Sequence, residues 1–389
     1  MVVAGGGWQV PLIQYLKNKG HYIINTNLYE DSPGFLYSDE SYVLDVRDKH
    51  KNLEIARNSN IDAIVSDQSD ISVTTVAFIA EKLGLSGIGT DIADLFTDKF
   101  KMRKRSKELG YSTPNFELCR SLEDAKRFFS LHDKIVIKPL DSQGGRGVRI
   151  LEHGTDIETA YNAAKNACKC GNVLIEEFLP GYELTVEGYK TKTGHTTLAI
   201  SEKRRMTAEP QIAQSIWYSK SALSKHAELV KTHNSLIEDF NLPFGMTHTE
   251  YICNNGEYTL IEAAARGGGN KISSHIAPFI SGVDTHAHLL DDILGFESAK
   301  IDIPTLKCSV VLDFFNFKPG KVKFVDGIES LSNHANVIDV ALNFIADRTI
   351  PILKDDSSRS GYIIATAEND EALIEILPKL KERVLVTYE

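Results

Sequence analysis

The chain has 389 residues, of which 42% are hydrophobic and 25% are charged, a composition typical of a folded soluble protein with two to four domains. Its formal net charge of −10 argues against a nucleic-acid partner, because no global positive field is available to phosphates. The cysteines are scattered, so we expect reduced thiols and a cytoplasmic protein. No apolar run approaches the ~18 residues of a membrane span, so no membrane partner is predicted.

The first part of the chain, residues 1–95, alternates short apolar runs with amphipathic stretches. Strands are predicted at MVVA, HYIINTN, SYVLDV and IDAIVSD, with helices between them. Such alternation is typical of a parallel, doubly wound sheet. Gly5, Gly6 and Gly7 follow the first strand, but Val10 stands where a dinucleotide fingerprint needs its last glycine. The motif for a nicotinamide cofactor is therefore incomplete.

A glycine-rich loop interrupts two apolar runs in KIVIKPLDSQGGRGVRIL, where Lys138 ends the first run. Glycines let backbone N–H groups approach a ligand, and such groups beside cations form an anion cradle. The loop is either a phosphate-binding hairpin or a flexible turn with incidental charge. A capped helix precedes it in TDKFKMRKRSKELG, and most of the basic residues in that helix are expected on its solvated face.

A second informative stretch is TEYICNNGEYTLIEAAARGGG, in which Glu250 and Glu262 lie on two predicted strands of one hairpin. A three-residue loop at 254–256 would place Glu250 opposite Leu260, with Glu262 as its diagonal neighbour on the same face. Diagonal side chains are roughly 7–8 Å apart, close enough to share an ion. Arg266 or a bound Mg²⁺ would then balance the two charges; the alternative is a solvated face with two exposed glutamates.

A lysine–glycine phosphate loop and a carboxylate pair suited to Mg²⁺ together describe a site for Mg·ATP. The chain has no P-loop motif and no protein-kinase motifs. The order of the pieces resembles the ATP-grasp superfamily, closely over residues 1–290 and more loosely afterwards. The resemblance implies an α/β and α+β multidomain fold. Its expected domains are a parallel, doubly wound N-terminal α/β domain (1–95), an ATP-grasp domain (96–295, with a nucleotide lid at about 112–185) and a β-rich C-terminal domain (296–389).

The resemblance also implies roles for individual residues. ATP phosphates would contact Lys99 and Lys138, and the loop that closes over the nucleotide would contain Ser142, Gly144, Gly145 and Gly147. The adenine would be bordered by Glu176, Glu177 and Leu179, and the ribose hydroxyls would bind Glu183. The metal would bind Glu250 and Glu262, and the transferred phosphate or acceptor carboxylate would face Arg266. Lone histidines such as His248 and His275 are interpreted as polar lining.

At one motif the sequence differs from part of the ATP-grasp superfamily, and this difference favours one branch of it. Biotin carboxylase and its nearest relatives have E-x-N-P-R at the second metal glutamate, whereas this chain has EAAAR, with Ala264 in place of the asparagine. L-amino-acid ligases resemble the chain more closely here, and KPGKVKFVDG and SSRSGYIIATAEND resemble their C-terminal domain. No biotin-carrier motif is present.

The resemblance therefore implies an enzyme, an ADP-forming carboxylate–amine ligase that uses ATP and Mg²⁺, for which Mn²⁺ could substitute. It would form an acyl phosphate on a small carboxylate such as an amino acid, and an amine would attack this intermediate. The alternatives are an ATP-grasp carboxylase using bicarbonate, a carboxylate–thiol ligase, and a non-catalytic ATP-binding protein. The expected partners are small-molecule carboxylates and amines, and the resemblance suggests a homodimer. Residues 201–221 would set selectivity, with Lys203, Arg204 and Arg205 facing an anionic substrate or the ATP phosphates.

Overall fold

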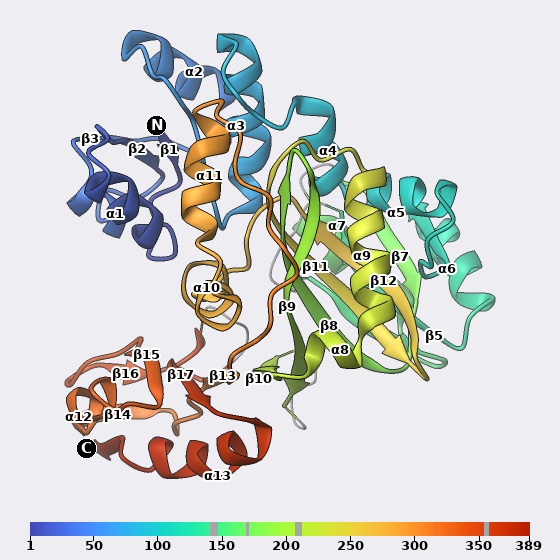
Figure 1. Cartoon of the computed structure of the whole chain (residues 1–389). Coiled ribbons are helices and arrows are strands. Elements are labelled where there is room, and N and C mark those ends of the chain that lie inside the picture. The colour runs from blue at the N-terminus through green and yellow to red at the C-terminus, as the bar shows by residue number, and fades with distance from the viewer. Residues whose placement is uncertain (141–146, 169–170, 207–211, 354–357) are drawn as a thin grey trace.

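The computed structural model (Figure 1) describes residues 1–140, 147–168, 171–206, 212–353 and 358–389. Most of the glycine-rich loop, including Ser142, Gly144 and Gly145, lies outside the described residues. None of the described helices is long and apolar enough to cross a membrane.

The N-terminal unit is a small parallel sheet with helices, as the alternating pattern predicts. Three parallel strands lie in the order β1-β2-β3, and Val65 adds an isolated parallel bridge to β1 at Val2. The strands are shorter than the apolar runs suggest. The predicted fourth strand, IDAIVSD, contains Val65 and contributes only this bridge. The elements are β1 (Val2–Val3), α1 (Val10–Asn18), β2 (Ile24–Asn27), η1 (Pro33–Tyr37), β3 (Glu40–Val43), α2 (Lys49–Asn58), α3 (Asp70–Leu83) and α4 (Thr90–Thr97).

The next unit is a four-stranded antiparallel sheet in the order β4-β7-β5-β6, which packs against two helices. The glycine-rich loop connects its strands β5 and β6. This unit contains β4 (Phe116–Cys119), α6 (Leu122–Ser130), β5 (Lys134–Pro139), β6 (Arg149–Glu152), α7 (Ile157–Ala167) and β7 (Val173–Glu177), and it is preceded by α5 (Lys99–Glu108).

The largest sheet has eight antiparallel strands in the order β12-β11-β8-β9-β10-β13-β17-β15. Because β10 pairs with β13, this sheet runs continuously from the centre of the chain into its C-terminal part. Its strands are β8 (Tyr182–Thr191), β9 (Gly194–Arg205), β10 (Ala213–Tyr218), β11 (Gly245–Asn254), β12 (Glu257–Ala264), β13 (Ser309–Phe314), β15 (Val337–Leu342) and β17 (Gly361–Ala367).

The remaining elements cover the sheets or join the units. Figure 1 shows α11 beside the N-terminal unit, where Leu289 and Ile293 share a core with Leu12 and Ile13. A small sheet in the order β16-β14-β18 completes the C-terminal part. These elements are α8 (Ala222–Lys225), α9 (Ala227–Asp239), η2 (Ile272–Ile276), α10 (Ala277–Ser281), α11 (Thr285–Ile293), β14 (Gly320–Asp326), α12 (Ile328–Ser332), β16 (Thr349–Ile350), α13 (Asp370–Lys381) and β18 (Leu385–Tyr388).

The predicted fold class is thus confirmed, while the domain boundaries at 95/96 and 295/296 stay predictions. The second boundary lies between α11, which packs on the N-terminal unit, and β13, which extends the large sheet. The chain between these two elements therefore leaves one core and enters another within a short stretch.

The core between β9, α9 and β11 contains two buried histidines. His195 contacts the side-chain oxygens of Asn234 and Thr247, each at 2.8 Å, through its two ring nitrogens. His233 contacts the Tyr251 hydroxyl at 3.1 Å. Buried polar groups need such partners, but these partners do not balance a positive charge. Both histidines are therefore held in their neutral form.

We expect these histidines to make stability fall below about pH 6.5. Burial lowers the pKa of His195 to about 4 from its ordinary 6.5, so the unfolded chain takes up a proton that the folded chain excludes. The stabilisation is complete above pH 6.5 and is lost as the pH falls toward 4, by roughly 3 kcal/mol for His195.

The measurement is the thermal midpoint between pH 7 and 4.5 for wild type, His195→Gln and the exposed control His153→Gln. His248, whose pKa is raised by Glu187 against the effect of burial, acts in the opposite direction but equally in all three proteins. A flatter profile is expected for His195→Gln only; parallel profiles for all three would contradict the explanation.

Candidate active site

The hairpin formed by β11 and β12 carries the two glutamates, but its register differs from the predicted one. Asn255 and Gly256 both have positive φ, 51° and 87°, and form a two-residue turn, which an Asn–Gly pair favours. This turn alone would place Glu250 and Glu262 on opposite faces. A β-bulge at Ile261 changes the register, so that Glu250 pairs directly with Glu262. The predicted three-residue loop is wrong, yet both carboxylates do share a face.

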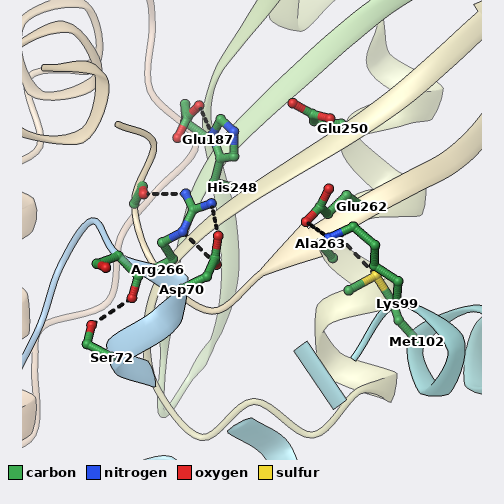
Figure 2. A network of polar contacts seen from close by, with 12 residues as sticks. Asp70, Ser72, Lys99, Met102, Glu187, His248, Glu250, Glu262, Ala263 and Arg266 are labelled. Carbon is green, nitrogen blue, oxygen red and sulfur yellow. Dashed lines mark hydrogen bonds and ion pairs between the residues drawn. The ribbon is translucent and has the colours of Figure 1, made fainter. Parts of the chain in front are cut away.

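Each of these glutamates contacts a lysine. Lys99 Nζ lies 2.9 Å from Glu262 Oε1, and Lys203 Nζ lies 3.0 Å from Glu250 Oε1. Figure 2 shows Lys99 reaching Glu262 from α5, with Glu250 on the neighbouring strand. In this structure two lysines therefore balance the charges of the two glutamates. Arg266 or a metal ion was expected in that role from the sequence.

The lysines also determine the charge state of the site. Burial alone would raise the pKa of Glu250, but Lys203, His248 and Arg205 together lower it to about 2. Burial opposes the charge of Lys203 as well, yet Glu183 and Glu250 raise its pKa. Glu183, the predicted ribose ligand, forms ion pairs with both Lys203 and Arg205. Glu250 and Lys203 thus hold one another in their charged forms.

The helix α5 positions Lys99 at its first turn. Asp98 caps the helix by accepting hydrogen bonds from Phe100 N and Lys101 N, both at 2.9 Å. Met102 and Arg103 follow Lys99 at the three- and four-residue spacing of one helix face and are fully buried. Most of the other basic residues of α5 are exposed, as expected, and Arg103 is the buried exception.

Arg103 forms a buried charged triad with Glu176 and Lys138. Arg103 Nε lies 2.6 Å from Glu176 Oε1, and Lys138 Nζ forms an ion pair with Glu176 Oε2. Burial would raise the pKa of Glu176, but Arg103 and Lys138 lower it to about 2. Both carboxylate oxygens of Glu176, one of the residues expected at the adenine, are thus held by cations. Its two positive partners outnumber its single negative charge, and burial together with Arg103 lowers the pKa of Lys138 in spite of its contact with Glu176.

The other residues expected around the nucleotide have different surroundings. Glu177 accepts hydrogen bonds from the backbone N and the side-chain Nδ2 of Asn115, at 2.9 and 2.8 Å. Leu179 is half-buried. Gly147 has φ of 75°, and a Cβ there would lie 2.7 Å from Pro139 Cγ, so both its backbone conformation and its close packing against β5 favour glycine.

Arg266 is held by a residue of the N-terminal unit. Its Nε and Nη2 contact the two carboxylate oxygens of Asp70, at 2.7 and 2.6 Å, and its Nη1 donates to Gly267 O at 2.9 Å (Figure 2). Burial opposes both charges, but Arg266 lowers the pKa of Asp70 and Asp70 raises that of Arg266. The bidentate pair fixes the plane of the guanidinium.

His248 lies beside this pair on β11. Its Nδ1 contacts Glu187 Oε1 at 2.6 Å, and Glu187 is almost completely buried. Sequence reasoning placed His248 as polar lining but did not identify Glu187, Asp70 or Arg103. The alternation of Glu183 and Glu187 with apolar residues along β8 was a signal for an inward-facing acidic row.

Glu177, Leu179 and Gly147 lie apart, and the other described site residues fall into three groups. The first group is the glutamate–lysine cluster of α5, β8, β9, β11 and β12. The second is the triad at Lys138, and the third is the Arg266–Asp70 pair. Among the described residues, no group of three or more histidine, cysteine, aspartate or glutamate side chains is arranged to hold a metal ion by itself.

Two protein families match parts of the chain. The family described as ATP-grasp domain matches residues 131–275, and L-amino acid ligase C-terminal domain 2 matches residues 313–389. The chain therefore carries an ATP-grasp domain followed by a C-terminal domain of the L-amino acid ligase type. This confirms the resemblance found in the sequence.

Individual curated proteins are similar in sequence to parts of this chain. Formate-dependent phosphoribosylglycinamide formyltransferase of Methanocaldococcus jannaschii is 30% identical over 177 residues, 44% of this chain and 45% of the relative. Alanine–anticapsin ligase of Bacillus subtilis is 28% identical over 279 residues, 65% of this chain and 57% of the relative. The matched segments thus span about half the length of these curated relatives.

A solved structure supports the same fold over the whole chain. The L-amino acid ligase from Bacillus licheniformis superimposes with a TM-score of 0.85 at 19% identity, covering 100% of this chain and 98% of that one. At 19% identity this similarity is evidence for a shared fold.

Proposed function

We propose that the protein is an ATP-dependent, ADP-forming carboxylate–amine ligase that activates a small carboxylate, such as an amino acid, as an acyl phosphate. The observation that carries the proposal is the direct pairing of Glu250 with Glu262, flanked by Lys99 and Lys203. Arg266 follows only four residues after Glu262. The L-amino acid ligase domain matched at residues 313–389 supports an amine, in preference to bicarbonate or a thiol, as the second substrate.

The residues present fit Mg²⁺ and ATP, the cofactors usual for ATP-grasp enzymes. Magnesium is commonly bound by one or two carboxylates together with substrate phosphates, and Glu250 and Glu262 are such a pair. When bound, the metal would neutralise phosphate charge and orient the triphosphate. Lys99 and Lys138 would supply further positive charge to the phosphates.

The lysine contacts suggest how the site changes when the nucleotide enters. In the described structure Lys99 and Lys203 neutralise the carboxylates on which a metal ion would bind. Phosphate oxygens are alternative partners for both ammonium groups. A triphosphate would therefore draw the lysines away and release Glu250 and Glu262 for the metal.

Arg266 is suited to the acceptor. Asp70 and Gly267 use three of its five N–H donors, which leaves one donor on each terminal nitrogen. Two donors on adjacent nitrogens match the two oxygens of a carboxylate or phosphoryl group. Because Asp70 fixes the guanidinium, Arg266 would hold the acceptor in one orientation, and positioning of this kind supplies much of the catalysis in phosphoryl transfer.

The experiment that tests this function follows oxygen from the carboxylate into phosphate. With a carboxyl-¹⁸O-labelled acceptor, we expect one labelled oxygen in each released phosphate, because the carboxylate oxygen attacks the γ-phosphorus and stays with the phosphate when the amine displaces it. The products are ADP, phosphate and amide, measured by mass spectrometry after a screen of carboxylate and amine mixtures.

Each alternative has its own result in this screen. Bicarbonate-dependent phosphate release without an amine would indicate a carboxylase, and thiol-dependent release a carboxylate–thiol ligase. Formation of AMP, or of unlabelled phosphate while amide accumulates in equal amount, would reject the acyl-phosphate mechanism. Nucleotide binding without any turnover would indicate a non-catalytic protein.

A further inference from the structure

A cavity of about 520 Å³ lies between α1 and η1 of the N-terminal unit and the segment formed by η2 and α11. This volume is within the range of small-molecule sites. A water molecule takes about 30 Å³ of liquid, so an ion as small as bicarbonate or formate would fill only a minor part of it. The cavity is therefore large enough for a substrate with a side chain.

The two walls of the cavity differ in chemistry. Val10, Pro11, Pro33 and Leu36 contribute apolar surface from the N-terminal unit. The opposite wall carries Lys271, His275 and His286, and no aspartate or glutamate is among the described residues that line the cavity. A ligand with an apolar part and a negatively charged end would satisfy both walls.

Two carboxylates near this wall contact its basic side chains without lining the cavity, and a third, Asp284, accepts a hydrogen bond of 3.4 Å from the lining residue Tyr15. Asp339 Oδ2 lies 3.4 Å from Lys271 Nζ and also accepts a hydrogen bond of 2.7 Å from the Tyr362 hydroxyl. Asp67 Oδ2 lies 3.4 Å from His286 Nε2. Both contacts are long for ion pairs, so the basic groups keep the capacity to bind an additional anion.

The cavity is connected to Arg266 by a short stretch of chain. Lys271 follows Arg266 by five residues. Next to Arg266, Gly267 N donates a hydrogen bond of 2.8 Å to Asp67 O. Asp67 is also the residue whose carboxylate contacts His286. His275 contacts Ser274 Oγ at 2.9 Å through its Nδ1. Burial and the Lys271 charge lower the pKa of His275, so it is a neutral hydrogen-bonding group near pH 7.

We propose that this cavity binds a second, non-reacting anionic group of the carboxylate substrate, either a carboxylate or a phosphate, through Lys271, His275 and His286. The inference rests on the proposed ligase function. It specifies the acceptor as a molecule that carries one anion to react near Arg266 and another to anchor it in the cavity.

The test compares acceptors that differ only in the second charge: L-glutamate with L-glutamine, L-aspartate with L-asparagine, and O-phospho-L-serine with L-serine. We expect at least one charged member to exceed its neutral partner about tenfold or more in kcat/KM for phosphate release. Preference for the dicarboxylates or for the phosphate ester identifies which anion the cavity takes. Equal or better use of all neutral members would overturn the inference while leaving the ligase function intact.

Substitutions at Lys271 and at a control lysine test whether the preference for charged acceptors depends on the cavity. Lys271 has φ of 67°, a conformation that asparagine tolerates well, so Lys271→Asn removes the charge without straining the backbone. We expect it to raise KM for the preferred charged acceptor about tenfold, and to raise the KM of the neutral partner much less. Lys192→Asn, at an exposed lysine paired with Glu297, is the control. Unchanged KM in Lys271→Asn would contradict the assignment.

If no acceptor supports phosphate release, the proposed ligase function is rejected. The anion site in the cavity can then still be tested by direct binding. Succinate and O-phospho-L-serine are then added to the nucleotide-free protein, and the thermal midpoint is measured. A rise in wild type that is lost in Lys271→Asn and kept in Lys192→Asn would support an anion site independent of turnover. No rise, or an equal rise in all three proteins, would overturn it.

Discussion

Glu262→Gln is expected to lower the turnover of the Mg·ATP-dependent reaction about 10²–10³-fold, the cost typical of losing one electrostatic contact to a phosphoryl or oxyanion transition state. Glutamine keeps an oxygen that can accept from Lys99 but loses the charge that a metal ion needs. The assay is ADP formation at saturating nucleotide with the acceptor found in the substrate screen.

The structure also gives the expected effect of Glu262→Gln on stability. If the two glutamates simply repelled one another, removing one charge would stabilise the protein. However, Lys99 contacts Glu262 at 2.9 Å, and Glu262 raises the pKa of this largely buried lysine against the effect of burial. We therefore expect an unchanged or slightly lower thermal midpoint.

The matched control is Glu257→Gln, which changes an exposed glutamate on the same strand and should alter neither turnover nor stability. Full activity in Glu262→Gln would remove the metal-binding role from this hairpin. A large loss of stability would instead assign Glu262 mainly to holding Lys99.

The hairpin illustrates how far the sequence determines this site. Apolar alternation around Asn255–Gly256 predicts the two strands and places both glutamates close to the turn. The bulge at Ile261 has no comparable local signal, because isoleucine is an ordinary strand residue and neither glycine nor proline marks the position. The shared face of Glu250 and Glu262 was predicted from an incorrect loop length, and only the three-dimensional register explains it.

The contacts missing from the sequence analysis are those between distant segments. Arg103 reaches Glu176 across 73 positions, and Arg266 reaches Asp70 across 196. A basic run predicts an exposed helix face unless a buried carboxylate is known to lie opposite one of its members. The family resemblance named Lys99 and Lys138 and also their acidic partners Glu262 and Glu176, but it did not predict that they pair. For Arg266 it did not supply the partner, Asp70, at all.

The Arg103–Glu176–Lys138 triad provides the second large expected effect. Glu176→Met should destabilise the protein by about 3–5 kcal/mol, because it leaves two buried cations next to each other without their shared partner. Lys138→Met should be far milder, since Glu176 keeps Arg103 at 2.6 Å and the remaining pair is neutral. Thermal unfolding of both variants measures this contrast.

The same two variants separate a structural lysine from a phosphate-binding one. The triad has two basic groups for one carboxylate, and burial with Arg103 lowers the pKa of Lys138. An anion bound at the loop that joins β5 and β6 would therefore favour the charged form of Lys138. We expect Lys138→Met to fold and to bind Mg·ADP or Mg·ATP at least tenfold more weakly, measured by calorimetry. Nucleotide affinity equal to wild type in a folded Lys138→Met would limit Lys138 to a role in stability. Wild-type stability of Glu176→Met would show that Arg103 and Lys138 find other partners, and that the charge at Lys138 does not depend on the triad.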